Sequence, residues 1–342
     1  MNKISGKKPA GTPTSAHRPP GDAQAVLIGL SAAVVSVAEE RPRVLVVERH
    51  ETPDSLPFGT FDPLAHRTLE SGLRDWVEEQ TGLQLGYAEQ LYTFGDRGRH
   101  LTDVGEGPRV LSVGYLALTR GEHAPSAPDT RWRDWYTHFP WEDWRENKPA
   151  IIETAILPGL SVFVAHAADA RQSVRRRDRV RVCFGTDDIG WDEEKVLERY
   201  ELLYEAGLVA EAWRDRGSHS PLAGTEVHLG RPMLFDHRRI LATAMGRMRS
   251  KMKYRPVVFE LMPPEFTLLE LQRTVEALSG IRLHKQNFRR LVESQGLVEG
   301  TGRIASHGRG RPAEQFRFRR DVLRERPAPG LRLGSRAPAK SK

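Results

Sequence analysis

Residues 263–296 read PPEFTLLELQRTVEALSGIRLHKQNFRRLVESQG, and this stretch decides the kind of fold. Thr267 precedes a helical pattern, and Glu270 follows three residues later, which is the spacing of a capping box. Apolar residues then recur at three- and four-residue steps until a break at Gly280. A second helix is expected over about 284–294. The stretch therefore predicts two consecutive helices joined by a short turn.

The second helix carries the polar side chains with which proteins read DNA. Phe288, Leu291 and Val292 form its apolar face and are expected to point inward. On the opposite face, Gln, Asn and Arg can bond base edges, and Lys and Arg can neutralise phosphates. We expect base contacts from Gln286, Asn287 and Arg290, and phosphate contacts from Lys285 and Arg289.

A two-stranded ribbon is expected after the second helix. Residues 297–299 and 315–318 have strand character, and a tip rich in glycine and arginine lies between them. Glycine lets such a tip approach a sugar-phosphate backbone, where Arg309 and Arg311 would neutralise phosphates. Two helices followed by a ribbon predict a winged-helix domain.

Positive charge is concentrated in this part of the chain. Residues 236–326 hold 20 Lys and Arg against 10 Asp and Glu, whereas the whole chain of 342 residues has a net charge of +7. A localised excess of this kind favours nucleic-acid binding. A helical hairpin with a solvated basic face is the alternative interpretation.

The length of the chain is sufficient for two domains. Cys183 is the single cysteine, so no internal disulfide can form, and a reducing cytoplasm is the expected location. The apolar run at residues 25–38 imitates a signal peptide but is too short to span a bilayer. Because residues 43–47 follow as a second apolar run, we interpret the pair as a β-hairpin and expect no membrane partner.

Residues 23–146 resemble a Nudix domain. The resemblance rests on four blocks in order: the hairpin, residues 56–59, a helix over about 68–80 that ends at Gly82, and a strand pattern over 90–96 and 109–116. A Nudix box needs carboxylates one helical turn apart, so that they converge on magnesium and lower the pKa of a bound water.

The box can be aligned in two registers. Counted back from Gly82, Asp75 and Trp76 stand where Arg and Glu belong, and Glu79 and Gln80 stand where the Glu pair belongs. One carboxylate then remains, and we expect no catalytic residues and no metal site. We favour this register because insertions are better tolerated in the loop after Gly59 than at the end of a helix.

The second register assumes one extra residue before Gly82. It places Asp75, Glu78 and Glu79 as three acids on one face, which would allow a weak hydrolase. The first register is also favoured because it leaves Leu69, Leu73 and Val77 as a clean apolar stripe.

Taken together, the two parts are similar to the Nudix-related transcriptional regulators of NAD metabolism, the NrtR-like family. The matching blocks are residues 87–95, 233–237, 252–256, 259–263, 266–272, 287–290 and 308–313. In that family, a Nudix fold that has lost hydrolysis senses an adenine nucleotide, and a winged helix binds operator DNA.

The resemblance implies a repressor of NAD biosynthesis genes that is a homodimer, binds double-stranded operator DNA and requires no cofactor. The implied effector is an adenine nucleotide such as ADP-ribose, ATP or NAD. By their positions in the motif, the candidate effector-binding residues are Phe58, Glu79, Phe94 and Arg109. An active Nudix pyrophosphatase with an accessory basic domain is the alternative, and a basic scaffold without an effector is a third.

The chain departs from the shorter family members between the two parts, as expected of a longer branch. After an aromatic run at residues 132–144, expected to be core, helices are expected over about 158–177 and 192–207. The arginine-rich residues 175–179 are interpreted as a solvated helix end, with phosphate contact as the alternative.

The fold class predicted for the whole chain is α+β. It comprises a Nudix-like α/β/α domain with a helical insertion, followed by a winged helix-turn-helix domain. The expected units are a disordered tail at 1–22, the Nudix-like effector-sensing domain at 23–146, the helical insertion at 147–235, the DNA-binding domain at 236–325, and a disordered basic tail at 326–342.

Overall fold

The computed structural model describes residues 26–49, 52–96, 109–120, 127–217, 229–305, 312–326 and 328–331. A six-stranded mixed sheet has the order β4-β5-β1-β2-β6, and β3 pairs with β1. All its pairings are antiparallel except that of β1 with β5. The strands are β1 (Val26–Ala38), β2 (Arg41–Val47), β3 (Phe58–Thr60), β4 (Tyr87–Phe94), β5 (Arg109–Leu118) and β6 (Thr130–Asp134).

The predicted hairpin is confirmed as β1 and β2. Its register pairs Val35 with Val44. The two turn residues, Glu39 and Glu40, have φ angles of 48° and 60°. Successive left-handed residues match the twist of two antiparallel strands, which is why tight hairpins use them.

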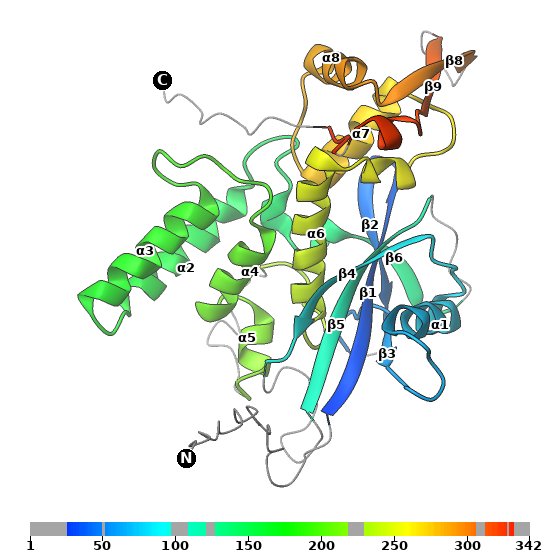
Figure 1. Ribbon diagram of the computed structural model, residues 1–342. Helices are drawn as coiled ribbons and strands as arrows, with labels where there is room; N and C mark the ends of the chain where they lie inside the picture. Colours follow the sequence, from blue (N-terminus) through cyan, green and yellow to red (C-terminus); the bar gives the residue numbers. More distant parts are fainter. Residues whose placement is uncertain are drawn as a thin grey trace, which may run out of the picture.

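Helix α1 (Leu69–Thr81) covers one face of the sheet (Figure 1). Thr68 caps its first turn, and Gly82 ends it in the left-handed conformation, with φ of 72°. Leu73 and Val77 are buried against alternate residues of β1. The helix predicted over 68–80 is therefore confirmed.

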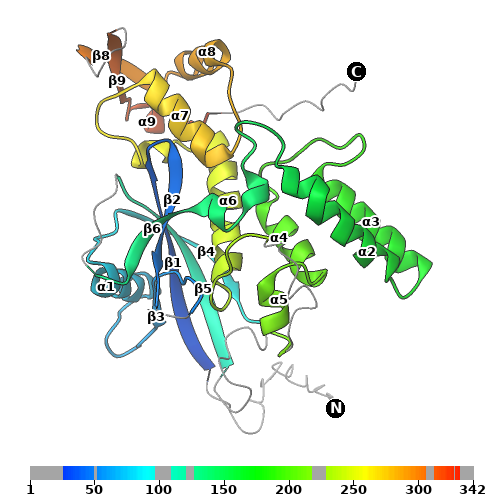
Figure 2. The same cartoon turned by 180° about the vertical axis from the view of Figure 1, so that it is seen from behind.

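Helix α6 (His237–Tyr254) covers the opposite face, so the sheet lies between two helices (Figures 1 and 2). Its Ile240 approaches β5 closely because Gly114 has no side chain: a Cβ there would lie 2.9 Å from Ile240 Cγ2. We assigned α6 to the DNA-binding unit at 236–325. Because α6 completes the α/β/α sandwich and also contacts the next domain, we propose that the domain boundary follows α6.

The insertion lies beside α6, on the side away from the sheet (Figure 1). It comprises the π-helical turn η3 (Ile152–Ile156), α2 (Leu157–Ala165), α3 (Ala170–Phe184), α4 (Val196–Glu205) and α5 (Ala210–Arg214). The prediction of one helix over about 158–177 is wrong, because Asp169 caps a new helix by accepting a hydrogen bond from the Gln172 amide. The second predicted helix exists as α4, but it begins at Val196 rather than at Asp192.

The aromatic run is core, as predicted. Trp135 lies in η1 (Trp135–Thr137), Trp141 lies in η2 (Pro140–Glu142), and Phe139 lies between them. All three side chains are fully buried. The rings of Phe139 and Trp141 meet edge to face, and Phe139 also contacts Tyr200 of α4. These three buried rings therefore join the sheet domain to the insertion.

The winged-helix domain follows α6 and the short helix η4 (Val257–Glu260). The capping box at Thr267 and Glu270 and the predicted second helix are confirmed, and the ribbon strands are longer than predicted. Phe259 of η4 stacks on Phe318 of the ribbon at 4.4 Å between ring centroids. The elements are β7 (Phe266–Thr267), α7 (Leu268–Ser279), α8 (Lys285–Gln295), β8 (Val298–Ala305), β9 (Ala313–Phe318) and α9 (Val322–Glu325).

Among the described residues, none of the helices combines the length and the apolar character that a membrane crossing requires.

Candidate nucleic-acid interface and effector site

Helix α8 presents a polar, basic face to solvent. Phe288 and Val292 are buried, with 2% and 0% of their surface exposed, and they hold the helix on α7. This burial turns the predicted DNA-reading side chains outward, and all five are exposed: Lys285, Gln286, Asn287, Arg289 and Arg290. Within the part of the chain that the structure describes, Arg289 and Arg290 have no ion-pair partner.

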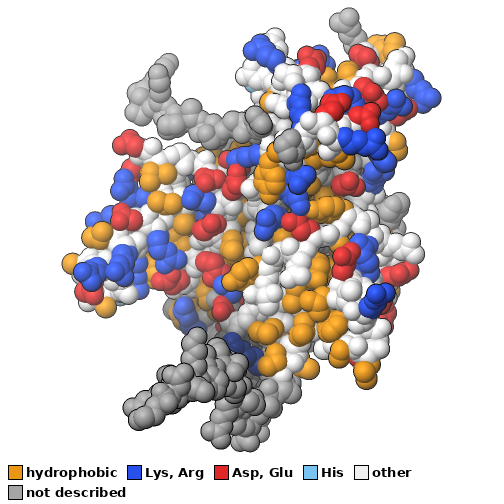
Figure 3. Space-filling model, viewed as in Figure 1, with side chains coloured by type: hydrophobic (Ala, Val, Ile, Leu, Met, Phe, Trp, Pro, Cys, Tyr) orange, Lys and Arg blue, Asp and Glu red, His pale blue; other side chains and the backbone are white. Residues whose placement is uncertain are grey.

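The ribbon β8–β9 projects beside α8 and forms the wing (Figure 1). Arg303 on the wing pairs with Glu265 at 2.9 Å, and Arg317 pairs with Glu299 at 2.6 Å. Figure 3 shows Lys and Arg side chains among acidic ones around the wing and α8. Arg309 and Arg311, the predicted phosphate contacts of the tip, lie outside the described residues.

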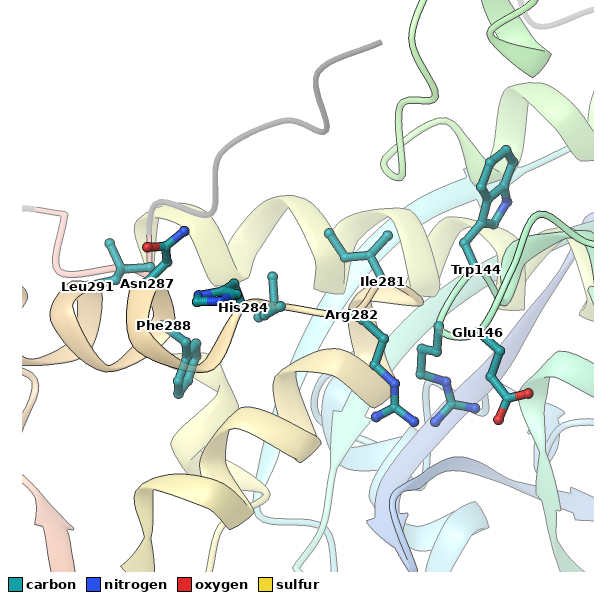
Figure 4. Close-up of a pocket in the computed structure, with 10 residues that line it drawn as sticks. Trp144, Glu146, Ile281, Arg282, His284, Asn287, Phe288 and Leu291 are labelled. Carbon is teal, nitrogen blue, oxygen red and sulfur yellow. The ribbon is translucent and has the colours of Figure 1, made fainter. Parts of the chain in front are cut away.

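A junction groove of about 450 Å³ separates α8 from the sheet domain. One wall is the loop Trp144–Glu146, and the other is the α7–α8 turn with one flank of α8 (Figure 4). Leu291, which we expected to point inward, is half-buried and lines this groove together with Asn287. Of the five predicted DNA-reading residues, Asn287 alone lines the groove, so it lies nearer to the sheet domain than Gln286 or Arg290 does.

In the Nudix-like box, two side chains at Glu positions of the favoured register bind the backbone of β3. Trp76 Nε1 donates to Thr60 O at 3.0 Å. The Gln80 amide donates to Phe58 O at 2.5 Å and accepts from Phe58 N at 3.2 Å. These two positions thus serve to fix β3 on α1.

The acids of the second register lie elsewhere on α1. Asp75, Glu78 and Glu79 are exposed, and the Asp75 carboxylate lies 3.8 Å from His66 Nε2. The Gly82 amide donates to Glu78 O, so α1 keeps regular α-helical hydrogen bonding up to its C-terminal end. Over the described ranges, no group of three His, Cys, Asp or Glu side chains is arranged to hold a metal ion.

Three aromatic rings gather where β3 meets the start of α6. Phe58 lies 5.5 Å from Phe235 and 5.0 Å from His237, centroid to centroid. Phe58 and Phe235 are half-buried, and the φ of Phe235 is 49°, a left-handed value that costs energy for a side chain of this size. Sequence reasoning placed Phe235 in a family block but did not single it out for this site.

The four predicted effector residues do not form one cluster. Phe58 lies beside Gln80 near the end of α1, and Glu79 is exposed on that helix. Arg109 is exposed at the start of β5 and donates to Gly95 O at 2.7 Å. Phe94 is 2% exposed and packs in the core cluster shared with α6, under the Arg239 guanidinium. Phe94 is a core residue in this structure.

Comparison with known proteins agrees with the arrangement of the C-terminal part. Residues 258–318 match the family model described as the NrtR DNA-binding winged helix domain. A curated protein, the ADPR responsive transcriptional repressor NtrR of Acinetobacter baylyi, is 36% identical over 120 residues, which are 34% of this chain. The chain spans about half the length of that relative, since the match covers 48% of it.

Two solved structures have a similar fold over most of the chain. The structure of Shewanella oneidensis NrtR with a 27mer DNA aligns with a TM-score of 0.50 and 20% identity, covering 87% of this chain and 95% of that one. The same protein without DNA aligns equally well, with 86% of this chain covered. The chain thus resembles the NrtR-type Nudix-related regulators, and its fold is α+β, a Nudix-like domain followed by a winged helix.

Proposed function

We propose that this protein is a DNA-binding transcriptional repressor of NAD biosynthesis genes, and that its Nudix-like domain senses an adenine nucleotide. The main support is that the segment matching the NrtR DNA-binding domain holds a helix with a basic, solvent-exposed face, on which Arg289 and Arg290 form no ion pair with any described residue. Exposed guanidinium groups of this kind bond guanine edges and phosphates. The relatives' names support the rest: one is ADPR responsive, and one was solved with DNA.

The DNA-binding half is tested by Arg290→Ala in a gel shift with DNA from upstream of the protein's own gene. A lost bidentate base contact is worth about 1 to 3 kcal/mol, so the Kd for the preferred sequence should rise roughly tenfold or more. Arg171→Ala on α3 is the matched control, since it removes the same charge from an exposed site outside both the winged helix and the arginine-rich residues 175–179. If the two variants bind this DNA with equal Kd, the proposed DNA contact of α8 is wrong.

For the effector, we propose ADP-ribose, ATP or NAD, bound beside Phe58 near the end of α1 that carries Glu79, with Phe235 as an added stacking surface. Arg109 pairs with Val26 of β1, five residues from Ser31, the partner of Phe58, so we leave it out of the proposed site. Support comes from the half-buried rings of Phe58 and Phe235, because aromatic faces stack on nucleotide bases. Calorimetric titration of each nucleotide into wild type and Phe235→Ala identifies the effector. Absence of binding by all three nucleotides would contradict a sensing role.

We propose that the Nudix-like domain is not an enzyme. The support is that Trp76 and Gln80 bind the backbone of β3 at positions where the favoured register needs carboxylates. The alternative, an active pyrophosphatase, requires Asp75, Glu78 and Glu79 to act together. Incubation with ADP-ribose and magnesium should give no AMP, and release at ordinary enzyme rates would establish the alternative.

A further inference from the structure

A single buried carboxylate, that of Glu142, connects three parts of the chain. Arg199 of α4, in the insertion, donates to both of its oxygens, at 2.6 and 2.9 Å. Arg249 of α6, in the sheet domain, donates to Oε2 at 2.6 Å. All three side chains are completely buried. Burial alone would raise the pKa of Glu142, but the two guanidinium groups outweigh it and lower that pKa, so the carboxylate is charged.

Arg249 extends this network into the winged helix. Its Nε donates to Leu278 O at 3.0 Å, and its Nη2 donates to Tyr136 Oη at 3.3 Å. The Tyr136 hydroxyl in turn donates to Ala277 O at 2.7 Å. We refer to Glu142, Arg199, Arg249 and Tyr136 as the Glu142 cluster. It satisfies two carbonyls in the last turn of α7, which a helix leaves without internal partners.

The residues next to the Glu142 cluster hold the end of α7 in one position. The Trp144 amide donates to Gly280 O at 2.7 Å. Gly280 has a φ of 75°, and a Cβ on it would collide with the carbonyl oxygen of Glu142. This close backbone contact leaves α7 little freedom to shift against the sheet domain without rearranging the cluster.

The position of α7 also determines that of α8. Gln272 of α7 donates to Leu283 O at 2.9 Å, and Glu276 of α7 accepts from Leu283 N at 2.9 Å. The N–H and the C=O of Leu283 are therefore both bonded to α7, and α8 begins two residues later. Consequently α7 and α8 move as one unit, and a displacement at the Glu142 cluster is carried to the DNA-reading face.

Strand β1 links the proposed effector site to the same unit. Residues 29–31 of β1 pair with β3, which begins with Phe58. At the other end of β1, Glu40 in the turn forms an ion pair with Arg273 of α7, and its carbonyl accepts from Arg145. A shift of β3 on nucleotide binding can therefore reach α7 along one strand.

We propose that the Glu142 cluster is the positioning element through which the effector changes DNA binding, and that the insertion contributes by fixing Glu142 through Arg199. Directional hydrogen bonds between buried charges favour discrete arrangements over a continuous range of angles. The two domains then have few relative orientations, and the effector selects among them. This inference rests on the proposed function and assigns a role to the inserted helices.

Tyr136→Phe tests the inference, because it deletes one hydroxyl of the cluster and leaves the ring and all charges. The measurement is the ratio of the DNA Kd with saturating ADP-ribose to the Kd without it. For Tyr136→Phe, this ratio should move about threefold or more toward one, while ADP-ribose affinity of the DNA-free protein stays unchanged. Tyr204→Phe is the matched control, since its hydroxyl bonds Asp215 at 3.0 Å within the insertion. The control ratio should equal that of wild type.

Thermodynamic linkage provides an independent check. The ratio of the ADP-ribose Kd with DNA to the Kd without DNA must change by the same factor as the ratio of the DNA affinities. Arg199→Leu tests the part played by the insertion and should shift the ratio in the same direction. If folded Tyr136→Phe gives the same ratio as wild type, the inference is wrong and the proposed function is unaffected. If the wild-type protein binds both ligands but its own ratio is one, ADP-ribose does not change DNA binding. In that case both the effector response of the proposed function and the inference are wrong.

Discussion

At the scale of single residues, Gln80 binds the backbone of β3 at a position where the favoured register of the Nudix box has a Glu. Its amide satisfies both the N–H and the C=O of Phe58, which no carboxylate can do because a carboxylate has no donor. Trp76 acts in the same way on Thr60. The favoured register predicts non-acidic residues at these two positions. It does not predict their contacts with β3, because these depend on which segment lies beside the helix.

Gln80→Glu should therefore destabilise the protein, even though it restores the family residue. The change places a carboxylate against Phe58 O and removes a donor, which should lower the free energy of unfolding by about 1 to 3 kcal/mol. Urea unfolding measures the difference. The exposed Gln90→Glu serves as control and should stay within about 0.5 kcal/mol of wild type. Equal stability of all three proteins would show that the Gln80 contacts contribute nothing.

His138 makes the stability of the protein depend on pH. Burial lowers its pKa from 6.5 to about 3, and the nearby Asp54 does not reverse this because Arg133 and Arg231 already pair with that carboxylate. Since the folded-state pKa lies below the unfolded one, the stabilisation is complete above pH 6.5 and is lost as the pH falls toward 3.

His138→Gln should flatten this pH dependence. At about pH 5, protonation of the unfolded chain should cost wild type roughly 2 kcal/mol relative to neutral pH, a cost that the variant lacks. Urea unfolding at both pH values gives the change in the free energy of unfolding for wild type and for the variant. His166→Gln, which changes an exposed histidine, should retain the wild-type slope. A wild-type slope in His138→Gln would mean that His138 does not titrate in this range.

At the scale of elements, the sequence predicts correctly those features that depend on hydrogen bonds within one helix or one hairpin. The capping box at Thr267, the hairpin of β1 and β2 and the end of α1 at Gly82 depend on neighbours in sequence. The break before Asp169 was missed because the flanking residues continue a helical composition, and only the cap interaction reveals the interruption. The position of α6 depends on tertiary contacts with the sheet, which its own residues do not encode.

The cap of α7 should contribute measurably to stability. Thr267 Oγ1 accepts from the Glu270 amide at 3.2 Å, and Glu270 accepts from the Thr267 amide at 2.7 Å. Thr267→Ala should cost about 1 kcal/mol. Thr154→Ala, at an exposed threonine that bonds only its own helical turn, should cost a few tenths at most. If both variants unfold at the same urea concentration, the capping box is not a stabilising feature.

At the scale of the whole molecule, one copy of α8 can contact only one half-site of an operator. Winged helices commonly act in pairs related by a two-fold axis, so that two reading helices enter grooves about 34 Å apart. We therefore predict a homodimer in solution. Light scattering after gel filtration should give twice the chain mass of 38.6 kDa. Inverting one half of a palindromic operator should then weaken binding, and a monomer that is insensitive to this inversion would contradict the prediction.

The late place of α6 in the chain has a consequence for biosynthesis. The ribosome completes every strand of the large sheet before the helix that covers its second face, and more than ninety residues separate β6 from α6. During that interval Ala33, Val35 and Leu116 lack the contacts that α6 makes with the sheet, and Tyr200 and Leu203 lack those that it makes with α4. Nascent chains that stop short of residue 237 should expose both surfaces and depend on chaperones. Once α6 has been synthesised, it buries the exposed face of the sheet and that of the insertion at the same time. The sheet domain and its insertion should therefore complete folding in a single late step.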